Sequence, residues 1–84
     1  MNGSTEEQRW ELTAGVCETP GAERVLVYGV RCCREGTVCW IWSDVDVDRE
    51  RVIQLIDRLN RAQPEPCHYG DIVRDFIEQE AANV

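Results

Sequence analysis

Two strand-like runs separated by only two residues constrain the fold of this chain most strongly. The runs are Arg24–Arg34 (RVLVYGVRCCR) and Thr37–Ser43 (TVCWIWS), and both are dense in β-branched and aromatic residues. Between them, Glu35-Gly36 forms a good two-residue turn, in which glycine permits a positive φ. The sequence therefore predicts an antiparallel hairpin.

The register of this hairpin determines which side chains share a face. A two-residue loop predicts the pairs Arg34 with Thr37, Cys32 with Cys39, Arg31 with Trp40 and Val30 with Ile41. One face is then apolar apart from a tyrosine hydroxyl. The opposite face is also mostly apolar, although the outer side of a half-buried antiparallel sheet is normally polar. The candidate interaction residues on that second face are Val27, Arg31, Val38, Trp40 and Trp42.

Alternating apolar residues predict a further strand before the hairpin. Trp10, Leu12, Ala14 and Val16 occupy every second position, which is the period of a strand with one buried face. The polar, acidic residues 1–8 (MNGSTEEQ) are expected to form a disordered tail.

The second half of the chain changes to a helical period. Asp48 is expected to be the N-cap of a first helix and Asn60 its left-handed C-cap. Pro66 suits the first turn of a second helix. The apolar positions of the two helices are Val52, Ile53, Ile56 and Leu59, then Tyr69, Ile72, Val73, Phe76 and Ile77. The sequence predicts one α+β domain over residues 9–82, a three-stranded antiparallel meander followed by a C-terminal helical hairpin (β-β-β-α-α).

Length and charge narrow the range of functions. The chain has 84 residues and a formal net charge of −7, so it is too short for a second domain and too acidic to favour nucleic acid or an anionic membrane. No stretch approaches the roughly 18 apolar residues of a membrane span. Five cysteines without regular spacing favour reduced thiols. We therefore expect a cytoplasmic protein without nucleic acid or membrane partners.

Soft metal ligands are present but poorly spaced. Cys32, Cys39, Cys67 and His68 are residue types that bind zinc, but no CxxC pair holds two of them on one metal. Cysteine is also an ordinary small core residue. The main expectation is buried or incidental thiols and no cofactor, while a metal- or redox-responsive protein built on these four residues is the alternative.

Catalytic chemistry is not indicated by the sequence. Cys67, His68 and Asp71 have the residue types of a nucleophile, a base and an orienting carboxylate. However, consecutive residues on a helix diverge by about 100°, so Cys67 and His68 do not face one another. We expect no enzymatic activity.

Short motifs within residues 24–78 resemble a known family. The motifs are Tyr28-Gly29-Val30, Ser43-Asp44-Val45, Leu59-Asn60, Pro66-Cys67-His68 and Asp71–Ile77. They are similar to a family of short uncharacterised Firmicutes proteins common in Clostridia, domain-of-unknown-function family 6514. Glu65 and Gly70 depart from its pattern, which has serine and leucine there. The resemblance implies a bacterial intracellular protein with strands followed by two helices, and it implies no activity, cofactor or catalytic residue.

These features favour a small non-enzymatic protein-interaction or regulatory module. Aromatic and arginine side chains are enriched at interfaces, and large exposed apolar patches are uncommon. We expect Arg31 to lie across Trp40 as a cation–π pair and to fix the orientation of a partner. The partner is an unknown protein, with a homodimer as one option. The competing interpretation is that the chain itself covers this face.

Overall fold

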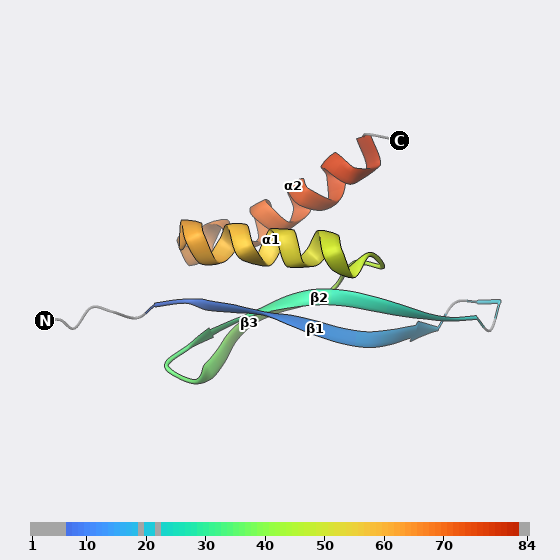
Figure 1. Ribbon diagram of the computed structural model, residues 1–84, viewed down its shortest axis with the longest axis horizontal. Coiled ribbons are helices and arrows are strands. Elements are labelled where there is room, and N and C mark those ends of the chain that lie inside the picture. The colour runs from blue at the N-terminus through green and yellow to red at the C-terminus, as the bar shows by residue number, and fades with distance from the viewer. Residues whose placement is uncertain (1–6, 19, 22, 83–84) are drawn as a thin grey trace, which may run out of the picture.

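The elements follow the predicted order in the computed structural model, which describes residues 7–18, 20–21 and 23–82. They are β1 (Arg9–Glu18), β2 (Arg24–Arg34), β3 (Thr37–Asp46), α1 (Arg49–Ala62), the 3₁₀ turn η1 (Pro66–His68) and α2 (Tyr69–Ala82). The strands form one antiparallel sheet in the order β1-β2-β3, and both helices lie on the same side of it (Figure 1). The predicted α+β meander with two C-terminal helices is confirmed. No helix in the described part of the chain is long and apolar enough to cross a membrane.

The β1–β2 ladder is regular over its whole length. It runs without a register shift from Arg9 opposite Cys33 to Glu18 opposite Arg24. Trp10 is buried against the helices, so the even-numbered residues of β1 share its face of the sheet. The core between sheet and helices contains Trp10, Val30, Cys32, Val45, Val52, Leu55, Leu59, Tyr69, Val73 and Phe76.

The β2–β3 hairpin departs from the predicted register. Arg34 lies opposite Thr37 as expected, but Cys39 is an extra residue in β3, and Trp40 takes its predicted place opposite Cys32. A one-residue bulge moves every following side chain to the other face of the sheet. The pairs beyond the turn are Cys33 with Val38, Cys32 with Trp40, Arg31 with Ile41 and Val30 with Trp42.

A second irregularity in β3 explains the glycine at position 29. Between two paired positions β3 uses three residues, 43–45, where β2 uses only Gly29. The backbone of β3 therefore approaches closely, and a Cβ at position 29 would lie 2.3 Å from the carbonyl oxygen of Trp42. Only glycine fits this position without a backbone shift.

The ends of α1 are capped, but the C-cap is not the predicted one. Asp48 is the N-cap as expected, and its Oδ1 accepts from the backbone N–H of Glu50 at 3.0 Å. The left-handed C-cap is Gln63, with φ 48° and ψ 56°, and its N–H donates to the carbonyl of Leu59. The prediction of Asn60 as C-cap is wrong, because α1 continues through Ala62, and the side chain of Asn60 instead contacts β1.

Candidate interaction surface

The outer end of the β1–β2 hairpin lies beyond the helices. In Figure 1 the hairpin continues past α1, while the helices cover the other end of the sheet. Two cross-strand pairs at this uncovered end lie on the helix-facing side, Ala14 with Tyr28 and Val16 with Leu26. Val16 is 61% exposed and Leu26 is 50% exposed. We call these four residues the hairpin strip.

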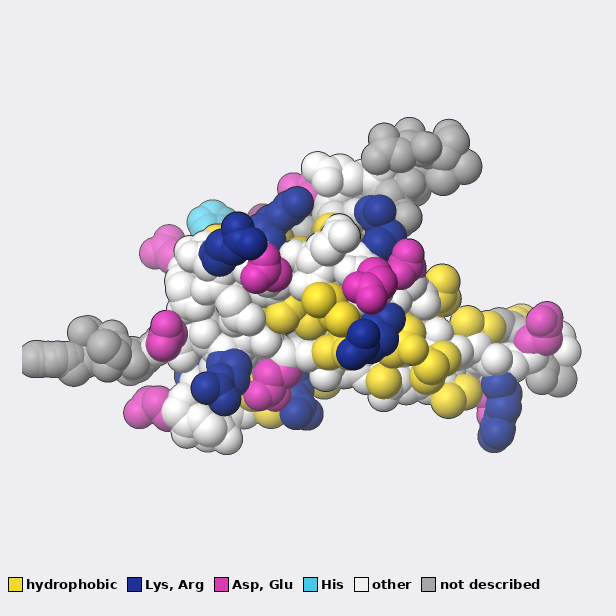
Figure 2. Space-filling view, in the orientation of Figure 1, with side chains coloured by type: hydrophobic (Ala, Val, Ile, Leu, Met, Phe, Trp, Pro, Cys, Tyr) yellow, Lys and Arg dark blue, Asp and Glu magenta, His cyan; other side chains and the backbone are white. Residues whose placement is uncertain are grey.

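The hairpin strip extends the apolar face of the sheet from the hydrophobic core to a region exposed to solvent. Leu12 and Tyr28 pack partly against the core, and Val16 and Leu26 follow on the same face. Figure 2 shows hydrophobic side chains that extend from beneath the helices along the hairpin. An apolar surface of this kind is a typical feature of a binding site.

The five predicted interaction residues do not share one face. Trp40 and Trp42 lie on the helix-facing side, opposite Cys32 and Val30, and both are half-buried against the core. Val27, Arg31 and Val38 lie on the outer side with Cys33. The single aromatic face is therefore wrong, because the bulge at Cys39 reverses the faces of the two tryptophans.

The tryptophans belong to an aromatic cluster of the core. The ring centroids of Trp10 and Tyr69 are 4.8 Å apart, and Trp40 lies 5.9 Å from Trp10 and 5.6 Å from Tyr69, all in edge-to-face arrangements. Trp42 extends the cluster at 6.0 Å from Trp40. These side chains hold the helices to the sheet.

Arg31 has a different partner from the one predicted. Its Nε forms an ion pair with Glu11 Oε1 at 2.8 Å, across the β1–β2 ladder. Ile41 occupies the position on β3 that Trp40 was expected to hold, so the predicted cation–π pair is wrong. Ile41 is 56% exposed and Val38 is 49% exposed, so the outer side has apolar residues with about the same exposure as the hairpin strip.

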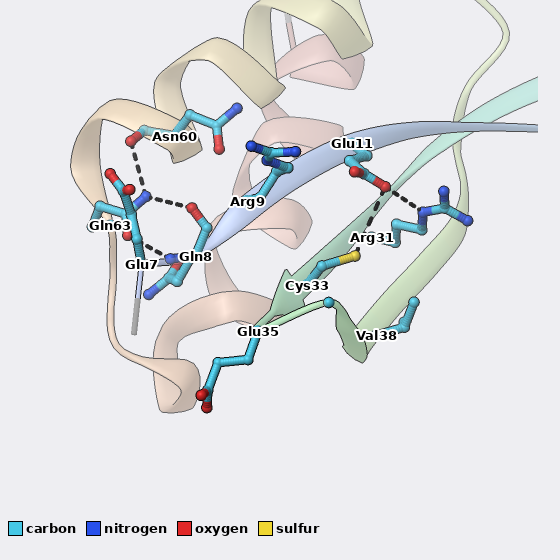
Figure 3. A pocket seen from close by; sticks show the side chains of 11 residues that line it. Glu7, Gln8, Arg9, Glu11, Arg31, Cys33, Glu35, Val38, Asn60 and Gln63 are labelled. Carbon is cyan, nitrogen blue, oxygen red and sulfur yellow. Dashed lines mark hydrogen bonds and ion pairs between the residues drawn. The ribbon is translucent and has the colours of Figure 1, made fainter. Parts of the chain in front are cut away.

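Two side-chain amides from the end of α1 close part of the β1 edge. Asn60 Oδ1 accepts from the N–H of Trp10 at 2.8 Å, and Asn60 Nδ2 donates to the Trp10 carbonyl at 3.3 Å. Gln63 forms the same pair of bonds with the backbone of Gln8, both at 2.9 Å (Figure 3). Each amide thus replaces a neighbouring strand at one residue. We call this arrangement the amide clamp.

Gln8 corrects the predicted boundary of the tail. Its side chain is buried, its Oε1 accepts from Trp10 Nε1 at 2.9 Å, and its Nε2 donates to the carbonyl of Pro64. The prediction of a disordered tail is therefore wrong at residue 8. Residues 1–6 of that predicted tail lie outside the described residues.

A pocket of about 760 Å³ lies beside the amide clamp on the outer side of the sheet (Figure 3). Glu11, Arg31 and Cys33 line it, and Cys33 Sγ lies 3.8 Å from Glu11 Oε1. Burial, and then the negative charge of Glu11, raise the pKa of the Cys33 thiol. A thiol held in its neutral form is a poor nucleophile, so this arrangement does not favour covalent catalysis.

The predicted metal-binding residues separate into two places. Cys32 is buried, and its Sγ lies 3.6 Å from the hydroxyl of Tyr69. Burial raises the pKa of both groups. Cys39 Sγ lies 3.4 Å from the Cys32 carbonyl oxygen. Cys67 and His68 lie elsewhere, in the exposed turn before α2.

The turn before α2 brings together three possible metal ligands, of which Glu65 was not predicted from the sequence. Three exposed residues each offer one ligand atom, and these three atoms lie within 4.8 Å of one another. The residues are Glu65, Cys67 and His68. This is the one such group of three or more metal-binding side chains within the described residues. The expectation that Cys67 and His68 do not face one another is wrong, because in the 3₁₀ turn their ligand atoms converge. The four-residue set predicted from sequence is not assembled, while two of its members gain Glu65 as a neighbour.

Comparison with known proteins adds no family or activity. No family model, curated protein or solved structure matches this chain. The resemblance to the Firmicutes family therefore stays a prediction.

Proposed function

We propose that this protein is a small, non-enzymatic interaction or regulatory module that binds another protein through the hairpin strip. The observation that supports this proposal is the exposure of Val16 and Leu26 on the same face as the core. Removing such side chains from water is favourable by roughly 25 cal/mol per Å². The proposal moves the binding residues from the two tryptophans to the uncovered end of the hairpin.

The cysteines favour a cellular location for the protein, and its net charge disfavours one class of partner. We place the protein in the bacterial cytoplasm, where its five cysteines stay reduced. Its net charge of −7 disfavours nucleic acid as the partner.

A matched pair of double variants tests the hairpin strip. V16S/L26S removes apolar surface from the strip, whereas V38S/I41S removes residues of about the same exposure from the outer side. Proteins captured on each variant from an extract of the source cells are quantified, and circular dichroism checks the fold. We expect V16S/L26S to capture at least tenfold less of a protein that the native chain binds specifically. V38S/I41S should capture as much of that protein as the native chain does. Equal capture by both variants would show that the strip is not the binding site.

Metal-dependent regulation is a second candidate function, supported by the proximity of Glu65, Cys67 and His68. A thiolate, an imidazole and a carboxylate are zinc ligands, and a fourth position would remain for water or a partner. Zinc titration against a chromogenic chelator tests it with Cys67→Ser, and with Cys17→Ser as a control at another exposed cysteine. Binding lost only in the first variant supports the candidate. No binding by the reduced native chain removes it.

A further inference from the structure

We propose that the open part of the β1 edge pairs with the same edge of a second copy of this chain, which joins two three-stranded sheets into one six-stranded sheet. This inference rests on the proposed function, because it names the partner of the hairpin strip. It also explains why β1 is closed by side chains at one end and open along the rest.

The amide clamp defines which part of β1 is open. Asn60 and Gln63 bond to the backbone of residues 10 and 8, whose N–H and C=O groups therefore point away from β2. Because these groups alternate along a strand, those of residues 12, 14 and 16 also point away from β2. They have no partner within the described residues. Such a row of unpaired groups is a template for another strand.

The second edge of the sheet is less suited to pairing. β3 is interrupted by the extra residue Cys39 and again at residues 43–45. Bulges twist an edge and break the regular spacing of its hydrogen-bonding groups. β1 keeps a continuous register across all ten of its residues. Of the two edges, β1 is therefore the one that can accept a strand.

The side chains of the open edge are self-complementary. An antiparallel pair with its two-fold axis at Ala14 places Leu12 opposite Val16 of the second copy, and Thr13 opposite Gly15. Apolar residues then meet apolar residues on the helix-facing side, and small residues meet on the outer side. Residues 12–17 contain no charged side chain, so two chains of net charge −7 can approach there with little local repulsion.

The same pairing covers the hairpin strip. A two-fold axis perpendicular to the sheet keeps the helices of both copies on one side. Leu12 lies half-buried at the margin of the helical layer, so Val16 of the second copy comes next to that layer. Each hairpin strip, which the helices of its own chain leave uncovered, is thereby placed beside the helices of the other copy.

Light scattering over a concentration series tests the pairing. Ala14→Lys places two like charges opposite one another across the proposed two-fold axis, and Ile41→Lys introduces the same charge on the β3 edge as a control. We expect a two-chain mass for the native protein and for Ile41→Lys, and at least tenfold weaker association for Ala14→Lys. A dimer that survives Ala14→Lys and is lost in Ile41→Lys would overturn the proposal.

Hydrogen exchange supplies a second measurement that does not depend on a variant. In the dimer the amides of residues 12, 14 and 16 exchange slowly and become fast on dilution, whereas those of Thr13 and Gly15, which face β2, stay slow. A single-chain mass with fast exchange at residues 12, 14 and 16 overturns the inference. If, in that case, V16S/L26S fails to capture a different protein that the native chain binds, the proposed function stands. If nothing is captured through the strip, both fail.

Discussion

Asn60 bonds to both backbone groups of Trp10, so that a helix side chain occupies the place of a neighbouring strand at the edge of the sheet. The two residues are 50 positions apart in the chain. Gln63 repeats the arrangement at Gln8 one turn later. The last turn of α1 is therefore fixed to the sheet by polar contacts in addition to the apolar core.

Loss of the Asn60 amide is expected to destabilise the fold. Asn60→Ala removes two hydrogen bonds and leaves two polar groups of Trp10 to find water, so we expect a loss of about 1–3 kcal/mol in the free energy of unfolding. Gln54→Ala, at an exposed position of the same helix, is the control and should change it by less than about 0.5 kcal/mol. Urea unfolding measures both. Equal effects would mean that the Asn60 amide contributes nothing.

Gly29 is expected to tolerate no side chain. In Gly29→Ala the new Cβ would meet the backbone of Trp42 and Ser43, and backbone atoms cannot rotate away, so we expect a loss of about 3 kcal/mol or more. At Gly15 a Cβ meets nothing within 4 Å. Gly15→Ala should therefore be neutral or up to about 1 kcal/mol more stable. Thermal unfolding of the pair at low protein concentration decides the comparison.

Trp40 and Ile41 provide a test of the bulge. Because Trp40 packs on Trp10 and Tyr69, Trp40→Ala should lower the free energy of unfolding by about 2–4 kcal/mol. Ile41 is largely exposed on the outer side, and Ile41→Ala should cost less than about 1 kcal/mol. The register predicted from sequence places Trp40 on the outer face, so a reversed order of the two effects would restore that register.

The five thiols are expected to react in an order set by burial. Cys17, Cys39 and Cys67 are exposed and should be alkylated first under native conditions at pH 8. Burial raises the pKa of Cys33 and Cys32, which lowers their thiolate fraction, and Cys32 should react last. Mass spectrometry of peptides at several times gives the order. Early alkylation of Cys32 would contradict its place in the core.

Stability is expected to fall in alkaline solution. The pKa values of Cys32 and Tyr69 are raised in the folded protein, first of all by burial. The unfolded groups ionise from about pH 8.5 and about pH 10, respectively, so the folded state holds more protons there. Its stability is complete below these values and is lost as pH rises through the folded pKa values. Urea midpoints at pH 7, 9 and 10 should decline, and Cys32→Ala should flatten the first part of the decline.

The parts of the fold that local sequence encodes could be predicted. Glu35 and Gly36 both adopt positive φ in a two-residue turn, and the change from strand to helix period placed all the main elements in order. The bulge at Cys39 could not be predicted, because a cysteine among β-branched and aromatic residues fits a regular strand equally well. Its presence depends on how Trp40 packs against the helices, which is a tertiary effect.

The sequence predicted the chemical character of the candidate site but not its location. An apolar sheet surface follows from the composition of the strands, but its location depends on which part of the sheet the helices cover. By residue type Asn60 was a plausible helix cap. Its contact with Trp10 joins residues 50 positions apart, so local sequence patterns contain no signal for this contact. The nearest sequence clue is the presence of two amide residues, Asn60 and Gln63, three positions apart where α1 ends.

The amide clamp also orders events during synthesis of the chain. Residues 8 and 10 leave the ribosome before α1 does, and the groups that close the strand edge there belong to a later segment, at Asn60 and Gln63, 50 and 55 positions further along the chain. Until that segment emerges, the nascent strand has an open edge along its whole length. Contacts between such distant segments form slowly. This strand, although translated before α1, is therefore completed late.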